Sequence, residues 1–461
     1  MMLRIAWRSL LTRPVRAAVL AGGFGFGIAV MAELLGVGHV ILEQAHAPAL
    51  EGGGDLVIYG TVGSVQSARF VMSSILRTPD LVHRIAAVSP SKTTRLYLTT
   101  AGGPIPVSAR GGIPSMEKAV GDPEVSGMTS WADAPGDARW SRPDAGDVLR
   151  AMDRFHPIAD VPEWAASWAE WLYFNGRTRD GRLRLYLTFL VGPRASTTGK
   201  RTAGVRLQLE RDGQSATYAA RGEIDEASLL AGAPDLEIAG NRVRLEGLTY
   251  RITLALSGLA GLTGEILLDA VAGRSMPPAA IRGAGGWMSG YVVPVLVGAM
   301  RGTLHIGRES LTLESLVGYH DHNWGFWDGV RWQWGQVAQD DVSVVYGRVF
   351  PPPEVADPTR IPGFLAVLGR DGPIGFSTDV TIDESVDAKK IDVRARGTAL
   401  ELRLTFDATE TVRTAMAITG LPVGSAMNFL QLGGLYHVSG RVAGRAIEFS
   451  ANGAAETFRS R

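Results

Sequence analysis

The feature that most constrains the fold of this chain is a series of short segments, from residue 171 onward, in which apolar and polar residues alternate. Residues 182–191 (RLRLYLTFLV) and 242–246 each place apolar side chains on one face and charged or polar ones on the other. Such alternation is typical of antiparallel strands with one wet face. Turn dipeptides such as Asn175-Gly176 and Asp212-Gly213 separate the segments, as in β-hairpins. The pattern predicts an all-β chain.

The same alternation continues through the second half of the chain. The further expected strands are residues 333–338, 342–350, 364–368, 374–382, 391–397, 400–406, 435–442 and 447–453. Two segments differ: residues 408–417 resemble a helix, and 421–431 resemble one less clearly. Trp164, Trp168 and Trp171 lie four and three residues apart, which predicts a short helix packed on the end of a barrel. A chain of 461 residues exceeds one ordinary core, so two barrels or sandwiches are expected.

Composition excludes several classes of protein. Lys plus Arg and Asp plus Glu number 46 each, so no net charge attracts nucleic acid. The chain has no cysteine, which excludes disulfides, cysteine-ligated zinc, iron–sulfur clusters and a thiol nucleophile.

The amino terminus has the pattern of a membrane anchor. Four arginines precede residue 17, and Ala17–Ile41 is apolar apart from Glu33 and His39. As a helix this segment would be about 37 Å long, enough to span a bilayer core of roughly 30 Å. The arginines would hold the amino terminus in the cytoplasm and place the β domains outside it. A signal peptide cleaved near Ala45-His46-Ala47 is the alternative.

These patterns divide the chain into four parts. Residues 1–45 are the expected anchor, and 46–150 a juxtamembrane segment whose portion 111–147 is rich in Gly, Pro, Asp and Ser, as in a linker. Residues 151–317 and 318–461 are the expected amino-terminal and carboxy-terminal β domains.

The string Tyr319-His-Asp-His-Asn-Trp-Gly-Phe-Trp327 concentrates chemistry in the middle of the chain. If residues 319–324 are extended, His320, His322 and Trp324 share one face, and Tyr319, Asp321 and Asn323 share the other. Proton donors and acceptors here lie beside large aromatic rings, a combination that suits a binding site for an apolar molecule with one reactive or polar group.

Several segments together resemble a known family. They are Trp171-Leu-Tyr173-Phe-Asn175-Gly176, Tyr291-Val-Val-Pro294, the strand Gly302–Ile306, Gly318–Gly325 and Trp332-Gln-Trp334-Gly335. Over residues 160–461 the chain resembles the two-domain lipocalin-like family of carotenoid 1,2-hydratases (hydroxyneurosporene synthases), AttH-type proteins encoded beside ABC transporters, and fungal Diels–Alderases. The resemblance implies two tandem lipocalin-like β-barrels with an apolar ligand in or between them. Leu172 stands where the family often has a second Trp, so the chain departs from the family pattern at a position expected to line the ligand pocket.

A second, shorter resemblance concerns the amino terminus. Arg4-Ile-Ala-Trp-Arg8-Ser-Leu and Arg13-Pro14-Val-Arg16 resemble the first membrane helix of permease subunits in ABC transporters of the lipoprotein-release type. One helix cannot form a permease, so this resemblance implies at most an ABC transporter as partner.

Three interpretations of the central string remain open. In the first, Asp321 is a general acid for hydration of a C=C bond, since a carboxyl buried among aromatic rings stays protonated near neutrality. Trp324, Trp327 and Tyr319 would stabilise the cation, and His320 or His322 would position water. In the second, His320 and His322 bind a metal with Asp321 or Asp328. In the third, the string only satisfies buried polar groups at the junction of the barrels.

The second interpretation is disfavoured, because the other histidines considered as a third ligand (His156, His305 and His437) lie in no paired spacing. No metal and no cofactor are therefore expected. The sequence predicts a membrane-anchored lipocalin-like protein that binds a large isoprenoid or lipid, with hydratase-like chemistry at Asp321, His320 and His322. The expected ligand-binding residues are Tyr319, Asn323, Trp324, Trp327, Trp171, Tyr173 and Tyr291. A non-catalytic lipid carrier that works with an ABC transporter is the alternative.

Overall fold

The computed structural model describes residues 12, 15, 54–58, 67–100, 103–122, 125, 128–141, 143–232, 234–258, 260–415 and 427–460. Contacts divide the chain into two units, Met1–Val65 with Ile85–Ser141 and Gln66–Arg84 with Arg142–Arg461. The predicted anchor, residues 17–41, lies outside the described residues. Among the residues that are described, no helix is both long enough and apolar enough to cross a membrane.

The unit that contains Ile85–Ser141 carries a β-hairpin. Its strands β1 (Ser91–Thr100) and β2 (Gly103–Gly112) pair in antiparallel register. Two short helices follow, α5 (Pro114–Ala119) and α7 (Ala138–Ser141). Regular structure therefore occupies part of the segment expected to be a linker.

The second unit holds the β domains and, among its described residues, seven short helical segments outside the sheets. These are α3 (Ala68–Arg77), α4 (Pro79–Val82), α8 (Ala145–Met152), α9 (Glu226–Gly232) and the 3₁₀ turns η1 (Ala165–Ser167), η2 (Ala284–Gly286) and η3 (Pro358–Arg360). Asp144 caps the amino terminus of helix α8, and its carboxylate accepts from the backbone N–H groups of Gly146 and Asp147. Val148, Leu149 and Met152 form its buried face, so α8 packs on the β domains and fixes the segment that follows it.

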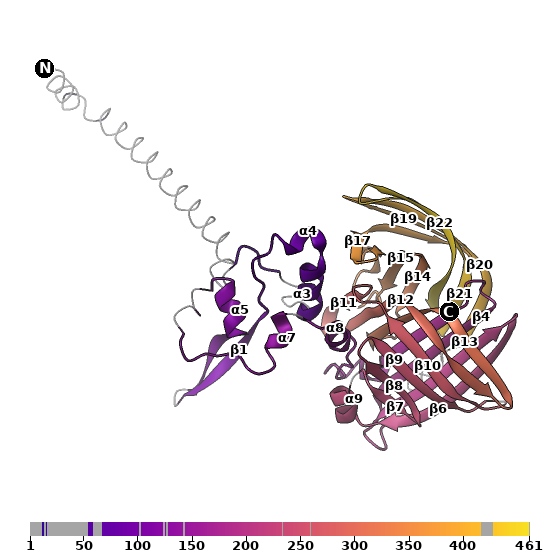
Figure 1. Cartoon of the computed structure of the whole chain (residues 1–461). Helices are drawn as coiled ribbons and strands as arrows, with labels where there is room; N and C mark the ends of the chain where they lie inside the picture. The colour runs from indigo at the N-terminus through magenta and orange to yellow at the C-terminus, as the bar shows by residue number, and fades with distance from the viewer. Residues whose placement is uncertain are drawn as a thin grey trace. The chain divides into compact units, whose positions relative to one another are not determined.

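The first sheet is an antiparallel meander that closes on itself almost completely (Figure 1). Its strands are β3 (Trp168–Arg177), β4 (Leu183–Arg194), β5 (Arg201–Arg211), β6 (Gln214–Ile224), β7 (Leu236–Ile238), β8 (Asn241–Glu246), β9 (Thr249–Leu256), β10 (Leu262–Ala270), β11 (Met276–Arg282), β12 (Met288–Ile306) and β13 (Glu309–Phe326). The last strand, β13, pairs with the first, β3. On the other side, Ala219 of β6 and Ser257 exchange backbone hydrogen bonds of 2.9 and 3.1 Å. The result is a nearly closed barrel.

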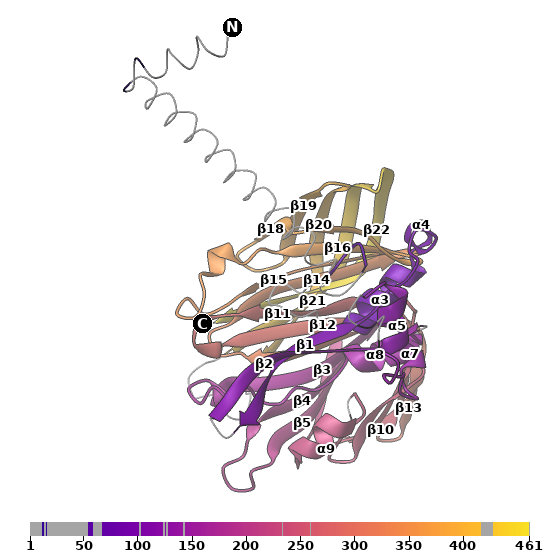
Figure 2. The same ribbon diagram turned by 90° about the vertical axis from the view of Figure 1, so that its left-hand side faces the viewer.

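The second sheet repeats this plan with nine strands. They are β14 (Arg331–Gln339), β15 (Val342–Phe350), β16 (Phe364–Gly369), β17 (Gly372–Ser377), β18 (Asp379–Glu384), β19 (Lys390–Gly397), β20 (Leu400–Ala415), β21 (Met427–Val442) and β22 (Arg445–Ser460). The last strand, β22, again pairs with the first, β14. The edge strands β17 and β18 are joined by residue 378 alone, and the Ser377 hydroxyl donates to the carbonyl of Arg396. In Figure 2 this barrel lies above the first.

The all-β prediction with two barrels is confirmed, and three local predictions are corrected. Residues 408–415 continue strand β20 and do not form a helix; residues 416–426 lie outside the described part. Trp168 and Trp171 belong to strand β3, and Trp164 precedes a 3₁₀ turn, so no helix carries the three rings. The helix that covers the barrel is α8. The expected boundary at 317/318 falls inside β13, which stays in the first sheet to Phe326.

Apolar side chains fill three regions. One cluster fills the first barrel and includes Phe174, Leu207 and Ile252, and another fills the second and includes Val393 and Leu404. A third joins strands of both barrels and contains most of the tryptophans. Strand β3 is buried at every position, because Leu172 and Phe174 face the first core and Trp171 and Tyr173 face the second barrel. Both of its faces are covered, which explains its nearly continuous apolar sequence.

Candidate functional site

Strand β13 presents its two faces to different environments. Its residues pair with β12 on one side and β3 on the other, so the side chains must alternate across the sheet. Tyr319, Asp321 and Asn323 face the second barrel, while His320 and His322 face the residues after helix α8. The predicted division of the string into two faces is therefore confirmed.

A narrow cavity of about 40 Å³ lies between the two barrels. The lining residues are Trp171, Tyr173, Thr188, Tyr291, Asp321, Asn323 and Trp327 from the first half of the unit, and Trp332, Trp334, Val349, Phe429 and Glu456 from the second. Aromatic rings form most of this wall. Two carboxyl groups, those of Asp321 and Glu456, are the acidic groups in it. The space holds a few water molecules or a small part of a larger molecule.

Hydrogen bonds fix the position of Asp321. The indole Nε1–H of Trp334 donates to the Tyr319 hydroxyl at 2.9 Å, and that hydroxyl donates to Asp321 Oδ2 at 2.8 Å. Trp334 sets the direction of these two hydrogen bonds, because an indole N–H can only donate. Asn323 Nδ2 donates to Asp321 Oδ1 at 2.7 Å. Both carboxyl oxygens of Asp321 therefore accept, as in a carboxylate.

Glu456 enters the cavity from strand β22 of the other barrel. Its carboxyl is hydrogen-bonded with the hydroxyl of Tyr173. Gln431 Nε2 donates to that same hydroxyl oxygen at 2.9 Å, so the proton of Tyr173 is directed to Glu456. Glu456 keeps some accessible surface because it borders the cavity.

Burial makes both carboxyl groups weaker acids. Loss of solvent raises the pKa of Asp321 to about 6, although its hydrogen bonds from Tyr319 and Asn323 and the nearby His320 oppose the rise. Loss of solvent, and then the charge of Asp321, raise the pKa of Glu456 to about 8. The pair therefore holds one proton near neutral pH. Glu456 keeps this proton, because Asp321 has the two donors that favour its ionised form.

The opposite face of β13 contacts a different set of ionisable groups. Asp153, the residue after helix α8, accepts from His320 Nε2 at 3.0 Å, His322 Nδ1 at 2.7 Å and the Tyr250 hydroxyl at 2.8 Å. His320 Nδ1 donates to the backbone carbonyl of Tyr173 at 2.9 Å. Desolvation opposes ionisation of Asp153, but the charges and hydrogen bonds of His320 and His322 outweigh it and lower its pKa.

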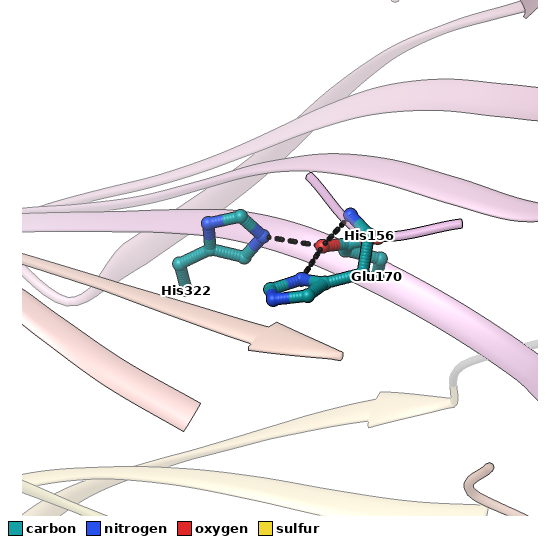
Figure 3. A group of neighbouring side chains, drawn as sticks. All are labelled: His156, Glu170 and His322. Atoms are coloured by element: carbon teal, nitrogen blue, oxygen red, sulfur yellow. Dashed lines mark hydrogen bonds and ion pairs between the residues drawn. The ribbon is translucent and has the colours of Figure 1, made fainter. Parts of the chain in front are cut away.

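Glu170 of strand β3 links this set to the surface (Figure 3). Its Oε1 lies 3.0 Å from His322 Nε2 and 2.8 Å from His156 Nδ1. Desolvation would lower the pKa of His322, but the carboxylates of Asp153 and Glu170 on its two ring nitrogens raise it to about 9. His156, Glu170 and His322 form the group of possible metal ligands among the described residues.

The structure brings together most of the predicted ligand-binding residues. Trp171, Tyr173, Tyr291, Asn323 and Trp327 line the cavity with Asp321, and Tyr319 lies behind Asp321 as its hydrogen-bond donor.

Three other predicted site residues lie on the opposite face of the strand. His320 and His322 are buried against Asp153, so neither reaches the cavity with Asp321. Trp324 stacks on His156, with ring centroids 4.2 Å apart. The predicted metal interpretation with Asp321 also fails in geometry, because Asp321 points away from both histidines.

Sequence reasoning missed Glu456, Asp153 and Glu170. Glu456 lies in the last strand of the chain, and only the pairing of β22 with β14 brings it beside β13 residues. Asp153 follows a short helix, and no local motif marks it. Glu170 lies next to Trp171 in a strand that is otherwise almost wholly apolar, and this buried acid was a signal that could have found it.

No protein-family model and no curated protein matches the sequence. Solved structures similar to the chain include a protein of Nitrosomonas europaea described as AttH, with 15% identity, 63% of this chain and 92% of that chain covered, and a TM-score of 0.42. Kievitone hydratase of Nectria haematococca has 14% identity, with 64% and 89% covered and a TM-score of 0.41. CghA has 11% identity, with 63% and 88% covered and a TM-score of 0.42. Proteins described as an AttH and as a hydratase are thus among the solved structures that are similar to this chain.

Proposed function

We propose that this protein binds a large apolar molecule, an isoprenoid or lipid, with a C=C bond placed in the cavity between the barrels. Glu456 and Asp321 then add water across that bond by acid catalysis. The observation that carries the proposal is a pair of carboxyl groups with raised pKa, one from each barrel, at a cavity walled by aromatic rings. Titratable groups whose environments separate their pKa values are typical of acid–base pairs.

The two carboxyl groups have different roles in this reaction. Glu456 holds the proton and donates it to one alkene carbon, which leaves a cation on the other. The faces of Trp327, Trp332 and Trp334 and the Asp321 carboxylate stabilise that cation. Water adds to the cation, and Asp321 accepts the proton that the bound water releases. This proton returns to Glu456 through cavity water, so the net change is alkene plus water to alcohol.

The size of the cavity limits what enters it. A space of about 40 Å³ accepts the reacting carbons but not a whole isoprenoid. Binding in this proposal therefore includes rotation of side chains at the cavity, with the rest of the ligand along the barrel junction.

The test uses the full chain in mild detergent with an acyclic carotenoid or squalene in H₂¹⁸O. We expect a product with one labelled hydroxyl, and a fall of at least roughly 100-fold in its rate of formation for Glu456→Gln and for Asp321→Asn. Glu448→Gln is the matched control, because Glu448 lies on the same strand but is exposed. Unlabelled product, or undiminished labelling in Glu456→Gln, would contradict the mechanism.

A non-catalytic carrier is the second candidate, and the apolar amino-terminal segment favours it because soluble catalysis needs no anchor. In this case native mass spectrometry of the protein purified from its own membranes shows one lipid per chain, and no polyene is hydrated. An empty cavity in that experiment argues against the carrier.

We further propose that residues 17–41 anchor the chain in the cell membrane, with the amino terminus cytoplasmic, the barrels outside the cytoplasm and an ABC transporter as partner. The absence of cysteine makes this directly testable. Ser310→Cys in intact cells should react with a membrane-impermeant maleimide, and Ser9→Cys should react only after lysis. The reverse pattern would exclude this topology.

A further inference from the structure

Three side chains from separate parts of the chain converge at one end of the first barrel. His156 follows helix α8, Glu170 lies on β3 and His322 on β13 (Figure 3). One atom of each, His156 Nδ1, a Glu170 carboxylate oxygen and His322 Nε2, lies within 4.8 Å of the other two. Glu170 Oε1 is 2.8 Å from the first histidine and 3.0 Å from the second.

This set of atoms has the chemistry of a zinc site. Two imidazole nitrogens and one carboxylate oxygen are a common three-ligand set, with water in the fourth position. Ligand atoms around a tetrahedral zinc lie roughly 3.3 Å apart, given bonds of about 2.0–2.1 Å. Glu170 Oε1 lies 2.8 and 3.0 Å from the two histidine nitrogens, a few tenths of an ångström closer than this, and all three atoms lie within 4.8 Å of one another. Rotation of the Glu170 and His156 side chains would therefore be needed to place the three atoms around an ion.

Asp153 supplies the partner that a zinc-bound histidine usually has. Its Oδ1 accepts from His322 Nδ1 at 2.7 Å, which leaves Nε2 as the nitrogen that faces Glu170. A carboxylate on the second ring nitrogen fixes the tautomer and orientation of a metal-binding histidine. On the other histidine, stacking on Trp324 at 4.2 Å fixes the ring plane of His156.

The electrostatics of this end of the barrel also suit a divalent cation. The side chains of Asp153 and Glu170 are fully buried, and their ion pairs within the described part of the chain are with histidines. Arg201 acts on Glu170 through space, but its guanidinium is bonded to Glu226 and to the Gly192 carbonyl. Two buried carboxylates need compensating positive charge. Protonated His322 supplies one unit of it, and a metal ion that replaces the proton on Nε2 of His322 would supply two.

An ion can reach these atoms from solvent. The His156 side chain is 33% exposed, whereas Glu170 and His322 are completely buried. Entry and a bound water are therefore both expected on the His156 side.

We propose that His156, Glu170 and His322 bind a divalent transition-metal ion, with zinc as the ion that this donor set favours, and that Asp153 positions His322. The ion would tie the segment after α8 to strands β3 and β13. This site lies on the face of β13 opposite Asp321, so the proposal does not depend on the proposed function.

The test is a titration of the full chain, treated with EDTA and dialysed, with Co²⁺ and then Zn²⁺. We expect one equivalent of Co²⁺ to give the visible absorption of four-coordinate cobalt, and Zn²⁺ to displace it. Glu170→Gln and His156→Ala should each weaken zinc affinity, measured by calorimetry, by at least about tenfold. His437→Ala is the control and should bind as the parent does, since His437 is exposed and bonded to Ser450.

Two results would overturn the proposal. One is a folded parent protein, judged by circular dichroism, that gives neither cobalt absorption nor a zinc heat. The other is zinc affinity in Glu170→Gln and His156→Ala equal to that of the parent, which would place the ion elsewhere. Both variants keep the hydrogen bond between Asp153 and His322, so we expect both to fold. Circular dichroism of each variant verifies this before the titration.

Discussion

Asp321 and Glu456 reach the same cavity from different barrels, yet their surroundings differ. Asp321 accepts from Asn323 and from Tyr319, which Trp334 holds in place, whereas Glu456 has the hydroxyl of Tyr173 and the negative charge of Asp321 beside it. Hydrogen bonds to a carboxylate favour ionisation, and a like charge opposes it. The proton that the two carboxyl groups share therefore resides on Glu456, because the hydrogen bonds from Tyr319 and Asn323 favour ionised Asp321.

This difference predicts how stability depends on pH. The folded-state pKa of Glu456, about 8, exceeds the unfolded value of about 4.3. Between these values the folded protein binds a proton that the unfolded chain has released, so the free energy of unfolding falls as pH rises. Glutamine cannot ionise, so Glu456→Gln should remove this fall in the free energy of unfolding. At pH 8 we expect the variant to be more stable than the parent by on the order of 2 kcal/mol. Urea unfolding at several pH values measures it.

The comparison is with Glu448→Gln on the same strand. Glu448 is exposed, so its substitution should leave the dependence on pH unchanged. If the parent and Glu456→Gln lose stability in parallel as pH rises, Glu456 does not hold the proton of the pair.

Among the residues of the site, the sequence was informative only where the chemistry was concentrated locally. Asp321 was identified because a carboxyl among aromatic rings is costly without a role. Glu456 was missed because its neighbours in space come from the pairing of β22 with β14, which no local pattern encodes. His320 and His322 were predicted to act beside Asp321, but they lie on the opposite face of β13, where they contact Asp153. The sequence could not show this, because Asp153 is far from both histidines along the chain.

At the scale of elements, β13 depends on a glycine that the central string contains. Gly325 has φ of +128°, and it pairs with Ser289 of β12. A Cβ atom there would lie 2.5 Å from the carbonyl oxygen of Met288 and 2.7 Å from the Cα of Ser289. Only glycine permits both this conformation and this close approach. Gly325 of the string is thus required by strand packing.

We therefore expect Gly325→Ala to destabilise the protein by at least about 2 kcal/mol, because both the backbone conformation and the contact with β12 must change. Thermal or urea unfolding gives the value. Gly232→Ala in α9 meets no atom within 4 Å and should change stability by less than about 0.5 kcal/mol. Equal effects of the two substitutions would show that the clash at Gly325 is relieved at little cost.

The strands that were predicted correctly are those in which apolar and polar residues alternate. In β8 this alternation follows core and solvent, whereas in β4 the second face, which carries Arg184 and Tyr186, is buried as well. Strand β20 was partly taken for a helix because its second half, 408–415, carries Thr, Glu and Ala residues without a clean alternation. The spacing of the three tryptophans at 164, 168 and 171 matched one face of a helix. Strand β3, which contains the last two, is buried on both faces, so its sequence does not show the alternation of a strand with one exposed face. Contacts from distant strands decided both cases.

At the scale of the whole molecule, the barrels share a core. The apolar cluster between them includes Trp171 and Tyr173 of the first barrel and Trp334 and Phe429 of the second. Polar bonds cross the same junction, among them Trp334 to Tyr319 and Gln431 to Tyr173. Separation of the barrels would expose these rings and leave buried donors without acceptors. The site therefore exists only when both barrels are folded and joined.

The shared core predicts that the two barrels unfold as one unit. Leu207 and Leu404 are fully buried, one in each barrel, and either change to Ala should cost about 2–5 kcal/mol. We expect hydrogen exchange, followed by mass spectrometry, to show that each substitution lowers the protection of β5 and of β20 by the same free energy. Val386→Ala, at a side chain that is 95% exposed, should lower neither. Loss of protection confined to the barrel that carries the substitution would mean that the barrels fold independently and that the cavity can open without unfolding.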